Sequence, residues 1–378
     1  TGHQMQAKAK NMLYDWFVTF RKEGFTEWNS SPYLPIDTLG FGSLYAFAQD
    51  PAMRELGREG MDFAYYLLAV HSQQGIFASS SGRTYIKEQF GNWSNCPSGL
   101  SWIGYGYGVP GHAGKGITSY CLSDYEPPKE FAQWFSIPQG KEMICQTTQG
   151  NDGYVDLYTY KTADYMMTSA NDFHPGEPGH QENPFQLTFN AVAQLWVTHP
   201  GERVLFGAAR PSYWAGNGTL PKVNQYKAFA GLIYDIAPEH PVDFTHLYLP
   251  SMEFDRCEVE GKWAFVQLGS AYAAVYCSNG MRMQDFGSNK DRECIAEGRR
   301  CIWLVRAAQA DEFAAFEDFK AAMRGAALDA DAEGRRYRFV DPVYGELRCQ
   351  WGETLYVNDA PMQYSGFDNY GKLTMQEK

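Results

Sequence analysis

Apolar residues recur every three or four positions in the first third of the chain, which predicts amphipathic helices. The pattern covers residues 7–22, 36–49 and 51–72, and a shorter stretch at 130–135. The Asp50-Pro51 step between the second and third helices is a stop and restart signal. The N-terminal part is therefore expected to consist of helical hairpins joined by loops.

Helical periodicity breaks down in residues 75–118, which are rich in glycine and aromatic residues. Seven glycines lie between Gly99 and Gly116. A loop of this length inside a compact protein is usually functional or disordered. Its tryptophan and tyrosine content argues against disorder, so the segment is a candidate functional loop.

From about Glu142 onward, apolar and polar residues alternate with period two, which predicts β-strands. Clear examples of this alternation are residues 153–161, 185–197, 226–236, 262–268 and 271–278. A single helix is predicted over residues 311–323, after which the alternation resumes. Strands of this length, separated by Gly, Asn and Pro turns, predict an antiparallel sandwich.

The chain has 378 residues, which is more than one core usually holds. Together with the change of periodicity, this predicts an α+β multidomain protein. A helical domain is expected in residues 1–138, followed by a large antiparallel β-sandwich in residues 139–378.

Composition places the chain among globular proteins and limits its partners. It is 44% hydrophobic and 20% charged, and no apolar run reaches the roughly 20 residues that span a membrane. The net charge of -12 argues against nucleic acid, which binds cationic surfaces. The aromatic share of 16% fits large cores and also the stacking platforms of sugar-binding clefts.

An anionic ligand would need a local cationic site on such an acidic protein. Two stretches of the sequence are candidates for such a cationic site. Residues 203–234 hold four basic residues and no acidic one, and residues 75–123 hold three basic residues and one acidic one.

Cysteine and histidine spacing gives no metal motif. The eight cysteines show no CxxC pattern; Cys294 and Cys301 are spaced for a hairpin disulfide, and free buried thiols are expected for the others. His174 and His180 bracket a Pro/Gly turn around Glu177, and neither helical nor strand spacing fixes them as ligands. We predict no cofactor, while a structural divalent metal in the sandwich stays open.

The segment GFTEWNSSPYLPIDTLGFGSLYAFA (residues 24–48) resembles one in the heparinase II/III-like polysaccharide lyases. There, an acidic residue and a serine precede a tyrosine at the start of a toroid helix. Further segments that look like relatives of this group are HPGEPGHQENPFQLTF, VTHPGE, RPSYWAGNGTLPKVNQ and DFTHLYLP. The resemblance implies a partial (α/α) toroid followed by a β-sandwich, and activity on uronic-acid-containing polysaccharides.

In the lyases, a tyrosine that matches Tyr33 acts as base or acid on the sugar. Elimination needs a base near C5 of a uronate, a donor for the carboxylate and a proton for the leaving oxygen. A phenol serves as a base only where nearby cations lower its pKa. Tyr33 is thus the candidate base and acid, with His174 or His180 assisting. Relatives often carry histidine after the tyrosine, where this chain has Leu34.

Other residues are candidates for substrate binding. Arg83 is suited to clamp a uronate carboxylate because its planar fork matches the two oxygens, and Asn29 is an alternative donor. The remaining candidates are His71, Tyr85, Arg210, Tyr213, Trp214 and Asn217, the last four combining aromatic rings, a Gly turn and positive charge. His71 also ends a helix, and the hairpin around Tyr213 also fits a purely structural role. His199 and His246 are read either as site residues or as core histidines.

Two alternative functions remain open from the sequence. Some relatives with this architecture are glucuronidases, and in that case Glu27 would be one of two catalytic carboxylates, with Asp37 as its neighbour. Asp37 capping the next helix is the structural alternative. A non-catalytic glycan-binding protein is the third interpretation.

The resemblance also bears on what surrounds the chain. A toroid has more helices than the four or five predicted before residue 138, so upstream helices are expected to be missing and apolar helix faces to be exposed. A polysaccharide substrate favours a secreted or periplasmic protein, although the opening TGHQMQAKAK carries no signal segment. The oligomeric state is open.

Overall fold

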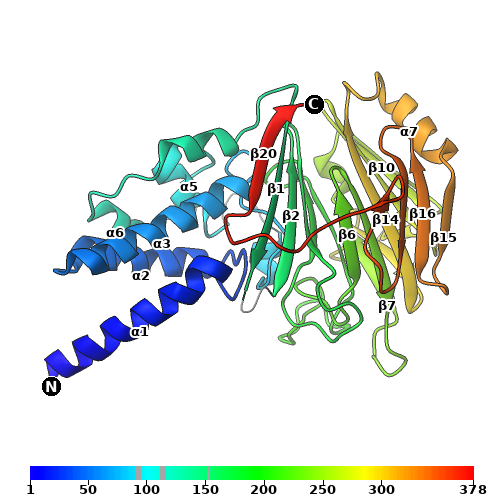
Figure 1. Cartoon of the computed structure of the whole chain (residues 1–378). Helices are drawn as coiled ribbons and strands as arrows, with labels where there is room; N and C mark the ends of the chain where they lie inside the picture. Colours follow the sequence, from blue (N-terminus) through cyan, green and yellow to red (C-terminus); the bar gives the residue numbers. More distant parts are fainter. Residues whose placement is uncertain (91–94, 111–115, 151–153) are drawn as a thin grey trace.

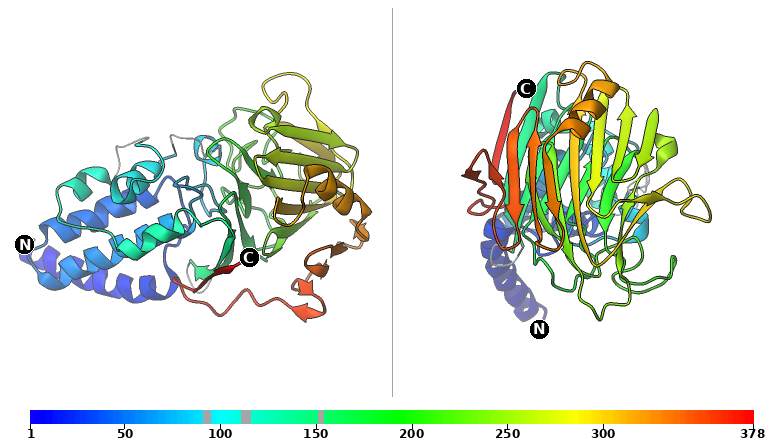
Figure 2. Two further views of the ribbon diagram at one scale, coloured as in Figure 1. Left: turned by 90° about the horizontal axis from the view of Figure 1, so that it is seen from above. Right: turned by 90° about the vertical axis from the view of Figure 1, so that its right-hand side faces the viewer.

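The computed structural model describes residues 1–90, 95–110, 116–150 and 154–378. Helices dominate up to Trp134, and β-strands dominate from Lys141 onward. Figure 1 shows the helices gathered at one side of the molecule and the sheets at the other, and Figure 2 shows the same division from above. The chain belongs to the α+β class.

Three long helices build the N-terminal part. They are α1 (Gly2–Glu23), α2 (Leu34–Phe47) and α3 (Pro51–Val70). Thr1 and Gln4 form a capping box at the start of α1, which explains why the helix begins before the predicted residue 7. Asp50 caps α3 by accepting a hydrogen bond from the Ala52 amide, as the stop and restart signal implied.

The glycine-rich segment contains more helix than its sequence predicts. Its short helices are α4 (Ile86–Gln89), α5 (Ser98–Tyr105) and α6 (Ile117–Cys121). The short helix predicted at 130–135 is present as the 3₁₀ helix η1 (Lys129–Trp134). Helix α5 ends where Gly106 takes a left-handed conformation, which glycine adopts without strain. The predicted loop also includes residues 91–94 and 111–115, which lie outside the described residues.

The strands of the described residues form three antiparallel sheets. The nine-stranded sheet contains, in spatial order, β12 (Arg282–Met283), β13 (Glu293–Glu297), β8 (Phe244–Tyr248), β5 (Gln194–Thr198), β4 (Phe185–Thr188), β3 (Met166–Asn171), β2 (Val155–Lys161), β1 (Lys141–Gln149) and β20 (Lys372–Glu377). The six-stranded sheet contains β6 (Lys222–Tyr226), β7 (Phe229–Asp235), β14 (Arg300–Gln309), β11 (Ala271–Cys277), β10 (Trp263–Leu268) and β9 (Arg256–Glu260). The third sheet contains β15 (Leu328–Asp331), β16 (Arg336–Asp341), β17 (Gly345–Gln350), β18 (Tyr356–Val357) and β19 (Ala360–Pro361).

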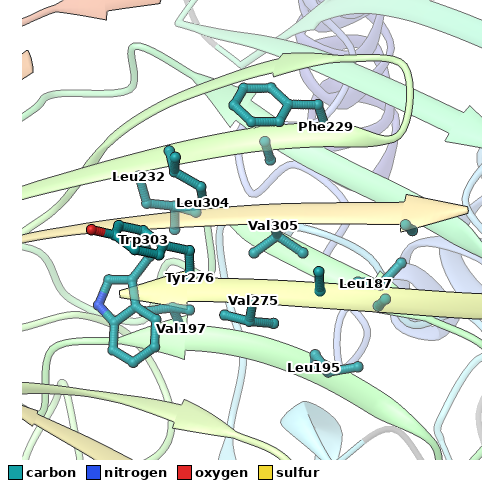
Figure 3. Close-up of a cluster of buried hydrophobic side chains, with 14 of the residues drawn as sticks. Leu187, Leu195, Val197, Phe229, Leu232, Val275, Tyr276, Trp303, Leu304 and Val305 are labelled. Carbon is teal, nitrogen blue, oxygen red and sulfur yellow. The ribbon is translucent and has the colours of Figure 1, made fainter. Parts of the chain in front are cut away.

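One buried cluster joins the two larger sheets. Leu187 and Val197 enter it from the nine-stranded sheet, and Leu232, Val275 and Val305 enter it from the six-stranded sheet (Figure 3). Burial of such residues supplies most of the favourable free energy of folding.

The third sheet packs against the same cluster through Tyr337 of β16. A Cβ added to Gly231 of β7 would come within 2.4 Å of the Tyr337 ring, so this contact requires glycine. Helix α7 (Phe316–Gly325) covers part of β11, and it begins at residue 316 rather than at the predicted residue 311.

The last strand returns to the first. After the third sheet, the chain runs back to β1, where β20 pairs with it from Lys141↔Glu377 to Gln146↔Lys372 (Figure 1). The helices also pack against β1, because Met143 and Cys145 share a buried cluster with Phe17 and Phe20 of α1. Helices and nine-stranded sheet are therefore joined by a common apolar core.

The structure corrects two predictions about local structure. Residues 185–197 are not one strand but the hairpin β4–β5, whose turn is held by the Asn190 side chain accepting from Val192 and Ala193. Cys294 and Cys301 do not form a disulfide, because they lie in different sheets. None of the eight cysteines, all of which lie in the described residues, forms a disulfide, and the Cys301 sulfur lies 3.3 Å from that of Cys277.

Helices α1 and α2 leave an apolar groove between them. Its volume is about 790 Å³, and its lining residues are Leu13, Trp16, Phe17, Ile36, Asp37, Gly40, Phe41, Ser43, Leu44, Phe47 and Ala48. Trp16 is 43% exposed and Phe47 is 59% exposed, which agrees with the expectation of open apolar helix faces. Within the described residues, no helix is long and apolar enough to cross a membrane.

Candidate functional site

Three loops meet where the helices join the nine-stranded sheet. They are the α1–α2 connection, the segment before α4 and the turn between β3 and β4. The Gly82 amide donates to the Trp28 carbonyl at 2.8 Å, and the Thr84 amide donates to the Gln181 carbonyl at 3.0 Å. Ser81 and Asn183 pair through both of their backbone groups. These bonds fix the segment that carries Arg83.

Arg83 is the centre of the group. Its Nε and Nη2 donate to Glu27 Oε1 at 2.8 Å and 2.5 Å, and its Nη1 donates to Gln181 Oε1 at 2.8 Å. The hydrogen bonds to Glu27 raise the pKa of Arg83. Each guanidinium nitrogen therefore already donates one hydrogen bond, and a substrate carboxylate would have to share the guanidinium with Glu27 or displace Glu27.

Two tyrosines lie between two arginines. The guanidinium carbon of Arg83 is 5.3 Å from the centre of the Tyr33 ring, and that of Arg210 is 5.2 Å from the centre of the Tyr85 ring. The phenols of Tyr33 and Tyr85 share a hydrogen bond. The group thus runs continuously from Arg83 through both rings to Arg210, and cation–π attraction stabilises each end.

The pKa of Tyr33 is raised rather than lowered. The hydrogen bond with Tyr85 is the main cause, and the nearby Arg83 charge only partly offsets it. The expectation that cations prepare this phenol as a base is therefore wrong for the ligand-free protein. Proton removal from Tyr33 would need the hydrogen bond with Tyr85 to change when substrate binds.

Two hollows open beside Arg83. The first has a volume of about 350 Å³ and is lined by Thr26, Glu27, Trp28, Gly82, Arg83, Tyr154, Phe173, His180 and Glu182. The second has a volume of about 520 Å³ and is lined by Tyr85, Ile86, Lys87, Gln181, Gly207, Ala208, Ala209, Arg210, Ser212 and Ala215. The Arg83–Gln181 bond lies between them, since each partner lines one hollow.

The two histidines of the Pro/Gly turn are placed differently. His180 is exposed and lines the first hollow together with Glu27 and Arg83. His174 does not line this hollow: its ring lies 5.0 Å from that of Tyr154, and its Nδ1 lies 3.3 Å from Glu177 Oε2. His180 is therefore the histidine that a ligand in the first hollow would meet.

Asn29 does not face either hollow. It is 1% exposed, takes a left-handed backbone conformation and donates from Nδ2 to the Ser80 carbonyl at 3.3 Å. Because the amide is used inside the loop, the structure does not support Asn29 as the carboxylate donor. Its side chain instead holds the α1–α2 connection to the segment before Arg83.

His71 lies in the core, although the sequence placed it with Arg83. Its Nδ1 is 3.0 Å from the Thr159 hydroxyl, and the ring is 1% exposed. Burial lowers the pKa of His71 to about 3, so the ring is neutral at physiological pH. His71 is too deeply buried to contact a substrate directly. The predicted binding role of His71 is therefore corrected to a packing role.

The predicted aromatic platform is also a packing feature. Trp214 is 2% exposed and stacks on His246 at a ring distance of 4.1 Å, while the Tyr213 hydroxyl donates to Glu293 Oε1 at 2.6 Å. Asn217 is completely buried and accepts from the His199 amide. These rings pack under the loop, so Tyr213, Trp214 and Asn217 line neither hollow, whereas Arg210 lines the second.

A buried polar network explains this packing. Glu293 Oε1 lies 2.7 Å from His246 Nδ1, and Glu293 Oε2 accepts from Asn289 at 2.8 Å. Burial raises the pKa of Glu293, but the His246, Tyr213 and Asn289 hydrogen bonds outweigh it and lower the pKa overall. His199 and His246 are both fully buried, as their interpretation as core histidines requires.

Asp37 lies in the first turn of α2. It opens into the groove between α1 and α2 rather than into the hollow of Glu27. Burial, with a smaller contribution from the Glu27 charge, raises the pKa of Asp37 to about 7. The two carboxyls are thus close enough to interact but open toward different spaces.

Sequence reasoning missed Gln181 and Tyr154. Gln181 joins the group because the Thr84–Gln181 backbone bond brings it opposite Arg83, and Tyr154 joins because its ring packs on Phe173 at 5.1 Å. Only the position of Gln181 beside His180 in a predicted turn could have indicated it.

No three His, Cys, Asp or Glu side chains in the described parts of the chain are grouped so as to hold a metal ion. Comparison with models of known protein families gives no match. Comparison with curated proteins likewise finds no significant similarity.

Proposed function

We propose that this protein is a carbohydrate-active enzyme that cleaves uronic-acid-containing polysaccharides or oligosaccharides by β-elimination. The observation that carries the proposal is the convergence of Glu27, Arg83 and His180 from three separate loops on one open hollow, with the Tyr33 ring against the Arg83 guanidinium. Arginine is the side chain best suited to a planar carboxylate, and the aromatic walls suit sugar rings.

In the proposed reaction, Arg83 binds the carboxylate of the uronate and stabilises the negative charge that develops on it. Tyr33 first releases its own proton to solvent and then, as a phenolate, removes the proton at C5. The electron pair forms the C4–C5 double bond as the bond from C4 to the leaving oxygen breaks. The leaving oxygen takes that same proton from Tyr33, which restores the phenolate, and Tyr85 stabilises the phenolate once their hydrogen bond has reversed so that the Tyr85 hydroxyl donates to Tyr33.

The proposal includes the finer architecture. We interpret the antiparallel helices α2 and α3 with their neighbours as part of an (α/α) toroid, and the two larger sheets with their common core as a heparinase II/III-like sandwich. The site then lies at the junction of the two parts. A polymeric substrate also fits a secreted or periplasmic location.

Product mass after incubation with a panel of uronate-containing oligosaccharides tests the reaction. We expect fragments whose masses sum to that of the substrate, one of them unsaturated. Tyr33→Phe should abolish this product, because the variant lacks the phenolic proton carrier. Tyr14→Phe on α1 is the matched control and should retain full turnover. Normal turnover by Tyr33→Phe would contradict the assignment.

Hydrolysis by a glucuronidase-type mechanism is the second candidate. It is favoured by the raised pKa of Asp37 near Glu27, since glycosidases use two carboxyls in different protonation states. Against hydrolysis, the Glu27 and Asp37 carboxyls open toward different spaces. Product masses that sum to substrate plus one water, together with greater damage from Glu27→Gln than from Tyr33→Phe, would select hydrolysis. Saturable binding without product would select a glycan-binding protein.

A further inference from the structure

The second hollow contains a cation without an anionic partner. Among the ion pairs of the described residues, none involves Arg210, whereas Arg203 in the same loop lies 2.6 Å from Asp243. The Arg210 guanidinium lies over the Tyr85 ring and lines the hollow. An exposed guanidinium held in place by an aromatic face is a preorganised donor for an anion.

The carboxylates near this hollow are already engaged. Glu88 is buried and pairs with Lys87 at 3.0 Å, so the charge of Lys87 is largely balanced. Glu202 accepts from the Ala209 amide at 3.0 Å. Arg210 therefore provides the positive charge that a ligand in this hollow can use.

The hollow also adjoins the proposed reaction site. Tyr85 lines it and shares a hydrogen bond with Tyr33, and Gln181 lines it while accepting from Arg83. Its volume of about 520 Å³ is within the range of small-ligand sites. A sugar bound here would adjoin the sugar held at Arg83.

We infer that the hollow formed by α4 and residues 207–215 is a second sugar subsite, in which Arg210 binds the carboxylate of a neighbouring uronate. This inference rests on the proposed function and narrows its substrate class. The preferred substrate carries carboxylates on consecutive sugars, rather than uronates that alternate with neutral sugars.

Isothermal titration calorimetry tests this subsite independently of turnover. The ligands are a tetrasaccharide made only of uronic acids and its carboxyl-reduced, neutral counterpart. Arg210→Gln should weaken binding of the charged ligand about tenfold or more, because a charge-assisted contact is lost. Arg203→Gln, the matched control, should change the affinity less than twofold, and both variants should bind the neutral ligand like the parent protein.

The outcomes separate the two proposals. Unchanged affinity of Arg210→Gln for the charged ligand, or equal losses for both ligands, would overturn the subsite. Failure of the parent protein to bind the charged tetrasaccharide would overturn it too. Binding that depends on Arg210 but never yields product would preserve the subsite and reject the proposed reaction.

Discussion

Burial separates the single residues that can meet a ligand from those that hold the fold. Arg83 and His180 line an open hollow, whereas His71 and Trp214 are at most 2% exposed. All four are residue types that sugar-binding sites use, so composition does not distinguish them. The solvent exposure of each side chain separates the residues that can bind a ligand from those that pack in the core.

The buried histidines make stability depend on pH. Burial lowers the pKa of His71 to about 3, while an unfolded histidine titrates near 6.5. Between these values the unfolded chain takes up a proton that the folded chain does not. The free energy of unfolding should therefore fall as pH drops from about 6.5 toward 3, by about 1.4 kcal/mol per pH unit for this residue.

Urea denaturation at pH 7.5, 5.5 and 4.5 measures this dependence. His71→Gln should remove part of the decline below pH 6.5, because glutamine does not titrate. His3→Gln, at the exposed start of α1, should leave the decline unchanged. An identical slope for His71→Gln and the parent protein would contradict a neutral buried His71.

At the scale of elements, one lysine links two helix ends to a strand. Lys161 of β2 is fully buried, and its Nζ donates to the Ala69 carbonyl at 2.9 Å and to the Trp134 carbonyl at 2.7 Å. Those carbonyls belong to the last turns of α3 and η1, whose final carbonyls lack partners within the helix. Burial lowers the pKa of Lys161 well below its usual value.

Lys161→Met should lower the free energy of unfolding by about 2 kcal/mol, because two buried carbonyls lose their donor while the apolar stem is retained. Thermal and urea unfolding provide the measurement. Lys372→Met on the exposed start of β20 is the control and should be neutral within about 0.5 kcal/mol. A neutral effect at position 161 would mean that these hydrogen bonds do not hold the helices to β2.

At the scale of the whole molecule, the apolar surface is concentrated at one end. The groove between α1 and α2 has a volume of about 790 Å³, and α1 projects from the body of the protein (Figure 1). Asp37 is the titratable group that lines it, and the raised pKa of about 7 makes this end more apolar in mild acid.

The native protein should therefore bind the dye anilinonaphthalene sulfonate, and more tightly at pH 6 than at pH 8. Protonation of Asp37 near pH 7 removes a negative charge that repels the anionic dye. Phe47→Ser should weaken dye binding about fivefold, whereas Phe286→Ser, at an exposed position outside the groove, should not. Asp37→Asn should abolish the pH dependence; fluorescence titration that finds it unchanged would assign the effect to another group.

Local patterns predicted most elements and misplaced some. Periodicity predicted α1, α2, α3 and the main strands. In a helix, side chains three or four positions apart share a face, and in a strand those two positions apart do, so both patterns can be read locally. Periodicity missed the short helices of the glycine-rich segment and merged β4 with β5. Glycine-rich segments and buried hairpins show only weak local sequence patterns for helix or strand. Packing against other elements decides the conformation of these segments.

Local sequence is enough to predict the order of helices and strands, the change of class near residue 138 and the presence of local cationic stretches. These properties are set by residues close together in the chain. The folded chain was needed to show that Arg83 meets Gln181, 98 residues away, and that His71, Asn29 and Trp214 are buried. Which side chains share a site depends on contacts between distant segments, and no local pattern encodes such contacts.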